Sequence, residues 1–335
     1  MAEGRFTNPV VASLAGIRDF FARQQLESRF TDLDRADGKT VMVTGANSGL
    51  GFALAVEFAR RGARVIMAGR SKIPEAGQRV AQRSGSDRVE MRYLDLSRIG
   101  TIHQFAEGLE SEGIGIDIAV FNAATALPGS RKTESGQDEM FLVNYLSNVI
   151  LSRLLITKKI VRTGTPEVQS RIIFISSDSH QGATAIDYDE FGRYFEYGVS
   201  KGISNYSYFK LVLNTYATEL SRRVNRNEVE LGINVICPGP VHSNIVKEAP
   251  WLLRMVLKGI FRVIFKSPSK AARPVVYMAL SEDYRGTTNQ YLHMFNPKKM
   301  DEKVYDPAEG ATLWERSMQL LQRIDPDFHQ YVDPG

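Results

Sequence analysis

The sequence has little of what a disulfide scaffold or a zinc site requires. Its 335 residues include one cysteine, Cys237, so no disulfide can form within the chain and no cysteine-rich metal site can be built. The five histidines are scattered, without the spacing of zinc ligands. We therefore expect no metal, and a reducing, cytoplasmic compartment in which a lone thiol is ordinary.

Long apolar runs and a strong charge imbalance are also missing. No stretch of about 18 uncharged apolar residues occurs, so we expect no spanning helix. We also expect no secretory signal, because Met1 to Ala36 lack an uninterrupted apolar segment. The net charge of +4 is too small to indicate nucleic acid as a partner. A 43% share of hydrophobic residues excludes a disordered chain.

What the sequence does contain is an alternation of strands and helices from residue 38 onward. A helix is predicted over Phe52–Arg61, and Gly62 ends it. The strand-like segments are Thr40–Thr44, Arg64–Ala68, Val89–Leu94, Ile116–Phe121, Arg171–Ile175 and Leu231–Ile236. This order predicts an α/β fold with a doubly wound parallel sheet, in one domain over residues 38–335.

Residues 1–37 are predicted to form an N-terminal helical extension. An apolar stripe at helical spacing supports a helix, and consists of Phe6, Val10, Leu14, Ile17 and Phe21. The stripe is suited to packing onto the domain or to docking on a membrane or a partner.

A glycine-rich turn joins the first predicted strand to the first helix. Glycines at this junction let the backbone approach a diphosphate, which the N–H groups and dipole of the helix N-terminus would bind. The residues of this candidate phosphate loop are Gly45, Asn47, Ser48, Gly49, Leu50 and Gly51. The sequence therefore predicts a Rossmann-type nucleotide-binding domain.

Further motifs follow the later strands: Asp95-Leu96, Asn122-Ala123-Ala124, Asn144 within a helix, Pro238-Gly239, and Leu313-Trp314-Glu315 near the end. With the Gly-x-x-x-Gly-x-Gly spacing of the loop, they resemble the short-chain dehydrogenase/reductase family over roughly residues 38–325. The retinol dehydrogenase-like branch is the most similar, although alanine replaces the last glycine of the Asn-Ala-Gly motif. The resemblance implies that Asp95, Leu96, Asn122, Ala123, Pro238 and Gly239 border the cofactor, and that the chain forms dimers.

The end of the second strand bears on the choice of cofactor. An acidic residue there would bind the ribose 2′-hydroxyl of NAD. This chain has Ala68-Gly69-Arg70 instead, and a guanidinium pairs well with a phosphate. We therefore expect NADP(H), with Arg70 at the 2′-phosphate.

Two Tyr-x-x-x-Lys pairs compete for the catalytic role that the family gives to a tyrosine and a lysine one helical turn on. They are Tyr197 with Lys201, and Tyr206 with Lys210. Nine residues are about half a revolution, so on one helix the pairs would face opposite sides. The sequence after Lys210 and its distance from Pro238 match the family, whereas Phe209 departs from the usual small residue. We favour Tyr206 and Lys210, and Tyr197 with Lys201 stays open.

The resemblance supplies the remaining site residues. Ser177, at the end of the fifth strand, would orient the carbonyl, in preference to its neighbour Ser176. Asn144 would hold a water that links the lysine to solvent. Ser243 stands where a threonine often contacts the nicotinamide carboxamide.

The stretch after Pro238-Gly239 borders the substrate, because ligands of such sheets bind beyond the carboxyl ends of the strands. Over residues 249–266 large apolar residues are interleaved with a basic stripe of Arg254, Lys258 and Arg262. This predicts a lid helix that packs on the domain, covers an apolar pocket or contacts lipid. Residues 249–274 carry +6, which points to an anionic lipid surface.

We therefore predict an oxidoreductase that interconverts a lipophilic aldehyde or ketone and its alcohol with NADP(H). The alternative is a non-catalytic NADP(H)-binding sensor or scaffold with the same fold. A reductase of a pigment ring, as in light-dependent protochlorophyllide reductases, has little support beyond Cys237 before Pro238.

Overall fold

A central sheet organises the computed structural model, which describes residues 24–164, 170–239 and 267–331. The order of the strands is β3-β2-β1-β4-β5-β6-β7-β8, and every neighbouring pair is parallel except β7 with β8. The strands are β1 Thr40–Thr44, β2 Arg64–Gly69, β3 Val89–Tyr93, β4 Ile118–Phe121, β5 Arg171–Ile175, β6 Gly232–Cys237, β7 Tyr291–His293 and β8 Asn296–Pro297. The doubly wound parallel sheet predicted from the sequence is confirmed.

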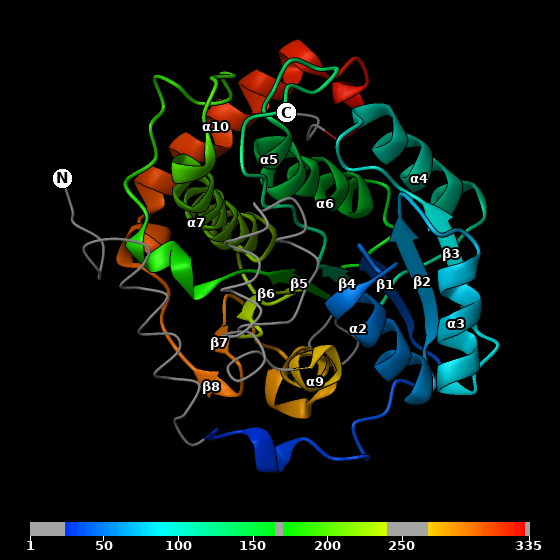
Figure 1. The fold of residues 1–335 in the computed structure, drawn as a ribbon. Helices are drawn as coiled ribbons and strands as arrows, with labels where there is room; N and C mark the ends of the chain where they lie inside the picture. The colour runs from blue at the N-terminus through cyan, green and yellow to red at the C-terminus, as the bar shows by residue number, and fades with distance from the viewer. Residues whose placement is uncertain (1–23, 165–169, 240–266, 332–335) are drawn as a thin grey trace.

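Helices cover both faces of this sheet (Figure 1). One face packs against α2 Gly49–Arg60, α3 Glu75–Ser84 and α9 Pro268–Leu280. The other packs against α4 Ile99–Ser111, α6 Ser147–Thr157, α7 Val199–Val224 and α10 Pro307–Ile324. Because both faces are covered, β5 and β6 are buried along their whole length, which explains their nearly continuous apolar sequences.

Short elements complete the described chain. The segment α5 Glu139–Phe141 continues through a π-helical turn, η2 Leu142–Leu146, into α6. The 3₁₀ turns are η1 Glu27–Arg29, η3 Asp178–Gly182, η5 Glu282–Tyr284, η6 Glu302–Tyr305 and η7 Phe328–Gln330. Glu139–Thr157 is long and apolar enough to cross a membrane, but 89% of its most apolar window is buried inside the fold. It is therefore the core helix of this domain.

Several predicted boundaries were wrong. The first helix begins at Gly49 rather than Phe52, so the phosphate loop leads directly into it. The fourth strand begins at Ile118, because Ile116 pairs only in an isolated bridge with Val161. Strands β7 and β8 were not predicted, because with three and two residues they are too short for a periodic pattern.

The described part of the N-terminal extension, residues 24–37, binds along the domain. Leu26 N–H donates to the carbonyl of Phe295 at 3.1 Å, and Glu27 pairs with Arg273 at 2.8 Å. The guanidinium of Arg61 donates to two backbone carbonyls of this segment, each at 2.8 Å. The apolar stripe between Phe6 and Phe21 lies outside the described residues.

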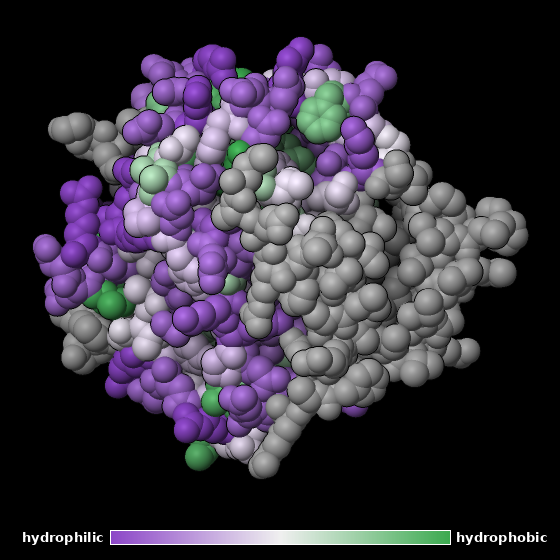
Figure 2. Space-filling view, turned by 90° about the vertical axis from the view of Figure 1, so that its left-hand side faces the viewer, coloured by the Kyte–Doolittle hydropathy of each residue, from purple (hydrophilic) through white to green (hydrophobic). Residues whose placement is uncertain are grey.

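The described surface that Figure 2 shows is mainly hydrophilic, with hydrophobic residues scattered among polar ones. Leu33 is the most exposed large hydrophobic residue of the described chain, at 88%. The lid helix predicted at residues 249–266, with Arg254, Lys258 and Arg262, lies outside the described residues.

Candidate active site

The site lies where the direction of strand order reverses, between β1 and β4. Ligands of open α/β sheets bind in the crevice outside the carboxyl ends of such strands. The ends of β1 and β4 are tied together here: the side-chain amide of Asn122 donates to the carbonyl of Thr44 at 2.9 Å. The hydroxyl of Thr44 accepts from the backbone N–H groups of Asn122 and Ala123, both at 3.0 Å. The predicted Asn122 motif thus braces the phosphate loop.

The phosphate loop has a backbone that requires glycine. Gly45 and Gly49 have φ of +64° and +58°, in the left-handed region. A Cβ on Gly51 would lie 2.5 Å from the carbonyl oxygen of Gly45 and 2.6 Å from the side-chain nitrogen of Asn122. Ser48 caps α2 with extended backbone and no side-chain hydrogen bond, so the first N–H groups of this helix remain available to an anion. This cradle fits a dinucleotide diphosphate.

Arg70 lies just beyond β2, as the sequence predicted, and 55% of its side chain is exposed. Its guanidinium lies 3.6 Å from Glu139 and 3.9 Å from Asp95. Beside it, the amide of Asn47 donates to the hydroxyl of Ser71 at 2.8 Å, which joins the phosphate loop to this corner. Leu96, after the third strand, is buried. Glu139 is a contact of Arg70 that sequence reasoning missed, because 69 positions separate them.

Tyr206 and Lys210 both lie within α7, one turn apart on the same side. The ammonium of Lys210 is buried, with the residue 2% exposed, and donates to the carbonyl of Ile175 at 2.7 Å. It lies 5.7 Å from the centre of the Tyr206 ring. This contact brings the centre of α7 to the end of β5, two residues before Ser177.

Burial dominates the electrostatics of this pair. It lowers the pKa of Lys210 to about 8 and raises the pKa of Tyr206 well above its ordinary value. Burial thus shifts both groups towards their neutral forms.

The competing pair is differently arranged. Tyr197 precedes α7, which begins at Val199, and its hydroxyl donates to the Asp138 carboxylate at 3.1 Å. Asp138 caps α5 by accepting from the backbone of Met140 and Phe141. Lys201 lies in the first turn of α7 and is exposed. Tyr197 and Lys201 thus do not share a helix, contrary to the assumption behind the half-revolution argument, and Tyr197 is engaged in a buried cap.

Ser177 follows β5 and begins η3. It is partly exposed, whereas Ser176 is buried and its hydroxyl has no hydrogen-bond partner within the described residues. The Ser177 hydroxyl accepts from the backbone N–H of Ser179 at 3.3 Å and from its hydroxyl at 3.0 Å. Only Ser177 of the two serines therefore faces accessible space.

Asn144 sits in the π-helical turn η2 and is fully buried. Its amide oxygen accepts from the N–H of Thr125, and its amide nitrogen donates to the carbonyl of Thr125, both at 2.7 Å. The side chain thus holds the loop after β4, and η2 packs against α7. Single π turns occur frequently at functional sites.

Pro238-Gly239 follows β6, where the sequence predicted the next cofactor contact. Gly239 has φ of +82°, and a Cβ there would lie 2.9 Å from the sulfur of Met294. The predicted contact Ser243 lies outside the described residues. Cys237 is buried at the end of β6, near Tyr206 and Lys210.

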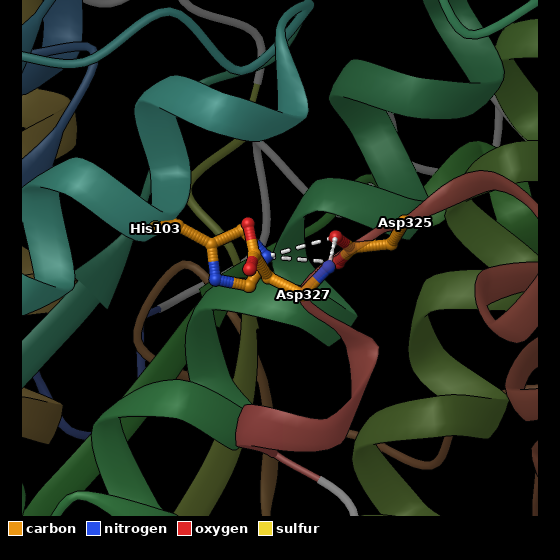
Figure 3. A group of neighbouring side chains, drawn as sticks. All are labelled: His103, Asp325 and Asp327. Carbon is orange, nitrogen blue, oxygen red and sulfur yellow. Dashed lines mark hydrogen bonds and ion pairs between the residues drawn. The ribbon is translucent and has the colours of Figure 1, made fainter.

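A histidine and two aspartates gather away from this site, at the C-terminal end of the described chain (Figure 3). His103 of α4 contacts both oxygens of Asp325 at 3.1 and 2.9 Å. The same carboxylate accepts from the hydroxyl of Tyr331 at 2.6 Å and from the N–H of Asp327 at 3.0 Å. Because these protein donors already bind Asp325, the group serves as a clamp that fastens the C-terminal segment to α4.

The fold and the phosphate loop define a Rossmann-type domain with a cradle for a dinucleotide. A family model described as short chain dehydrogenase matches residues 39–188. Human retinol dehydrogenase 13 is 31% identical over 303 residues, covering 89% of this chain and 88% of that protein. Human polyprenol dehydrogenase is 27% identical over 289 residues, with 86% of each covered.

Solved structures agree with this fold. An uncharacterized protein from Mycobacterium paratuberculosis has a TM-score of 0.66 and 26% identity, covering 87% of this chain and 97% of its own. The angucycline C-6 ketoreductase LanV, solved with bound NADP, has a TM-score of 0.59 at 24% identity, covering 78% and 95%. The chain belongs to the short-chain dehydrogenase/reductase family, in its retinol dehydrogenase-like branch.

Proposed function

We propose that this oxidoreductase interconverts a lipophilic aldehyde or ketone and its alcohol, with Ser177, Tyr206 and Lys210 as the catalytic set. The observation that carries the proposal is the hydrogen bond from Lys210 to Ile175 at 2.7 Å. It fixes a buried lysine beside Tyr206 and next to the strand end that presents Ser177. Asn144 supports the set by holding the loop after β4.

The protonation states of Tyr206 and Lys210 suit the donation of a proton to a carbonyl oxygen. A dinucleotide held by the phosphate loop would supply the hydride for the carbonyl carbon. Tyr206 is neutral at physiological pH, the form that can donate a proton to the carbonyl oxygen. Lys210, with a pKa of about 8, can exchange protons near neutral pH and so restore the phenol. Ser177 donates a hydrogen bond to the same oxygen and orients it.

NADP(H) is the cofactor we infer. Support comes from Arg70 after β2, from the absence of an acid at the end of that strand, and from the glycine cradle at Gly45 and Gly51. A guanidinium that is 55% exposed can turn towards a 2′-phosphate, because its ion pairs at 3.6 and 3.9 Å are long. Ser243 would contact the nicotinamide end.

A lipophilic substrate and a membrane surface belong together in this proposal. The apolar and basic sequence of residues 249–266 supports a lid at the cytoplasmic face of a membrane. Relatives named for retinol and polyprenol support substrates of that kind. Flotation with anionic liposomes tests it: the chain should float, and a variant with Arg254, Lys258 and Arg262 changed to Glu should not. A chain that never associates with lipid contradicts the membrane part.

We also infer a homodimer from the family resemblance. Sedimentation of the full chain tests this, and a monomer would contradict it.

The decisive experiment measures NADPH consumption with a panel of lipophilic aldehydes and ketones. Tyr206→Phe should lose on the order of 10²-fold or more in kcat, the usual contribution of a general acid. Tyr197→Phe is the matched control, and should keep its activity while losing about 1 kcal/mol of stability with the Asp138 hydrogen bond. Loss of activity in Tyr197→Phe with full activity in Tyr206→Phe would overturn the assignment. Tight NADPH binding without turnover of any substrate would favour a sensor or scaffold.

A further inference from the structure

A buried histidine contacts the backbone of the proposed catalytic serine. His180 is the third residue of η3, is fully buried, and packs edge-on against the ring of Tyr291 at a centroid distance of 5.6 Å. Its Nδ1 lies 2.7 Å from the carbonyl oxygen of Ser177. Its Nε2 lies 3.2 Å from the backbone nitrogen of Asp301, in the segment after β8. The ring therefore spans two segments that are 121 residues apart.

The two contacts fix the tautomer of this ring. A backbone N–H can only donate, so Nε2 must accept from Asp301 and carries no proton. Nδ1 then carries the proton and donates it to the carbonyl of Ser177. Burial lowers the pKa of His180, which keeps the ring neutral. The imidazole is thus a fixed donor towards Ser177.

Hydrogen bonds and an ion pair of Asp178 also hold η3 in place. Asp178 accepts from the hydroxyl of Tyr291 at 3.1 Å and from the side-chain amide of Gln181 at 2.7 Å. Lys298 pairs with its second oxygen at 2.7 Å. With Asp178 anchored to β7 and His180 to the segment after β8, the turn that carries Ser177 has little freedom to rotate.

This anchoring determines which way the serine hydroxyl can act. A hydroxyl has two lone pairs and one hydrogen. Ser179 donates to the Ser177 oxygen twice, through its N–H at 3.3 Å and its hydroxyl at 3.0 Å. The hydrogen of Ser177 is then the part left to be donated, as a substrate carbonyl oxygen requires. The arrangement depends on the orientation of the Ser177–Ser179 backbone, which His180 fixes through the Ser177 carbonyl.

We propose that His180 is a positioning residue for Ser177: it holds the serine backbone so that the hydroxyl donates to the substrate oxygen. The inference rests on the proposed function, because it assigns His180 a part in the same reaction. It predicts that the donor at Nδ1 matters for turnover and that the acceptor at Nε2 matters mainly for stability.

Two substitutions separate these atoms. His180→Asn places an amide N–H where Nδ1 lies and keeps the donor to Ser177. His180→Gln reaches the position of Nε2 and keeps the acceptor for Asp301. His103→Asn is the matched control, since it changes another buried histidine, in the C-terminal clamp. For each we would measure kcat and KM for the aldehyde, the Kd for NADPH by fluorescence, and the melting temperature.

We expect His180→Gln to lose on the order of 10²-fold in kcat, the cost of misplacing a reacting group by about 1 Å. His180→Asn should stay within about tenfold of the parent, because the donor to Ser177 remains. The Kd for NADPH should not change in either variant, and His103→Asn should lose stability but keep kcat. Equal kcat values for the two His180 variants would overturn the proposal, as would full activity in His180→Gln.

A second measurement does not depend on turnover. The ¹⁵N chemical shifts of His180 at neutral pH should show a protonated Nδ1 and a bare Nε2. A proton on Nε2 would overturn the positioning role whatever the kinetics. If the parent protein binds NADPH but reduces no substrate, the proposed function fails. The kinetic role of His180 then fails with it, while the ¹⁵N shifts report separately on its contact with Ser177.

Discussion

The ammonium of Lys210 donates to the carbonyl oxygen of Ile175 at 2.7 Å, inside the protein and away from water. A buried lysine is costly unless it is paired or neutral, and no carboxylate pairs with it among the described residues. This unfavourable burial occurs where α7 packs against the end of β5. Perturbed buried groups of this kind concentrate at functional sites.

Lys210→Met should change the dependence of stability on pH. Because the folded pKa of about 8 lies below the unfolded value of 10.5, the buried lysine costs stability in full below about pH 8. The cost disappears as pH rises towards 10.5, and it is on the order of 3 kcal/mol for such a shift. The stability of the variant, measured relative to that of the parent, should therefore be greater at pH 7 than at pH 10. Chemical denaturation at both pH values measures the difference, and a pH-independent difference would contradict it.

Arg70→Ala should change the cofactor preference. Removing the guanidinium should weaken the binding of NADPH by about 10- to 100-fold, the contribution of a charged hydrogen-bonded pair. The binding of NADH should be nearly unchanged. Arg98→Ala is the control, because Arg98 is equally exposed and pairs with Glu134. Fluorescence titration gives both dissociation constants. An equal loss for the two cofactors would assign Arg70 a structural part instead.

Gly51→Ala should damage the phosphate loop. Its Cβ would lie 2.5 Å from the Gly45 carbonyl oxygen and 2.6 Å from the side-chain nitrogen of Asn122, which is held in place by its hydrogen bond to the Thr44 carbonyl. We expect a loss of roughly 1–3 kcal/mol in stability and weaker binding of the dinucleotide, measured by melting and by NADPH fluorescence. Gly100→Ala in α4 is the control, since nothing lies within 4 Å of its Cβ. Unchanged NADPH affinity in Gly51→Ala would argue against a close approach of the diphosphate.

Tyr331→Phe should loosen the C-terminal clamp without affecting the site. The phenol donates to the buried Asp325 at 2.6 Å, and a hydrogen bond to a charged group contributes about 1.5–3 kcal/mol. The ring contacts with His103 and Phe328 would remain. Denaturant titration should show the loss, with the Kd for NADPH unchanged. Stability equal to that of the parent would mean that Asp325 finds another donor.

The sequence alone predicted the sheet and its class, because each strand and helix has its own local pattern. Thr44 to Gly51 shows a strand, glycines at fixed spacing and a helix start, all within eight residues. The position of Arg70 was also predicted from a local pattern, because this residue directly follows the second predicted strand. Such local patterns can be recognised from the sequence alone, and the confirmed parallel fold and family assignment rest on them.

Tertiary structure alone decided how distant groups meet. It placed Tyr197 before α7 and engaged it with Asp138, which no count of residues along a helix could reveal. It set Glu139 beside Arg70, and it joined His180 to Asp301 across 121 positions. It also buried Lys210, and Tyr206 in part. Spacing gives proximity along a helix, but a pKa depends on burial, and burial is fixed only when the whole chain packs.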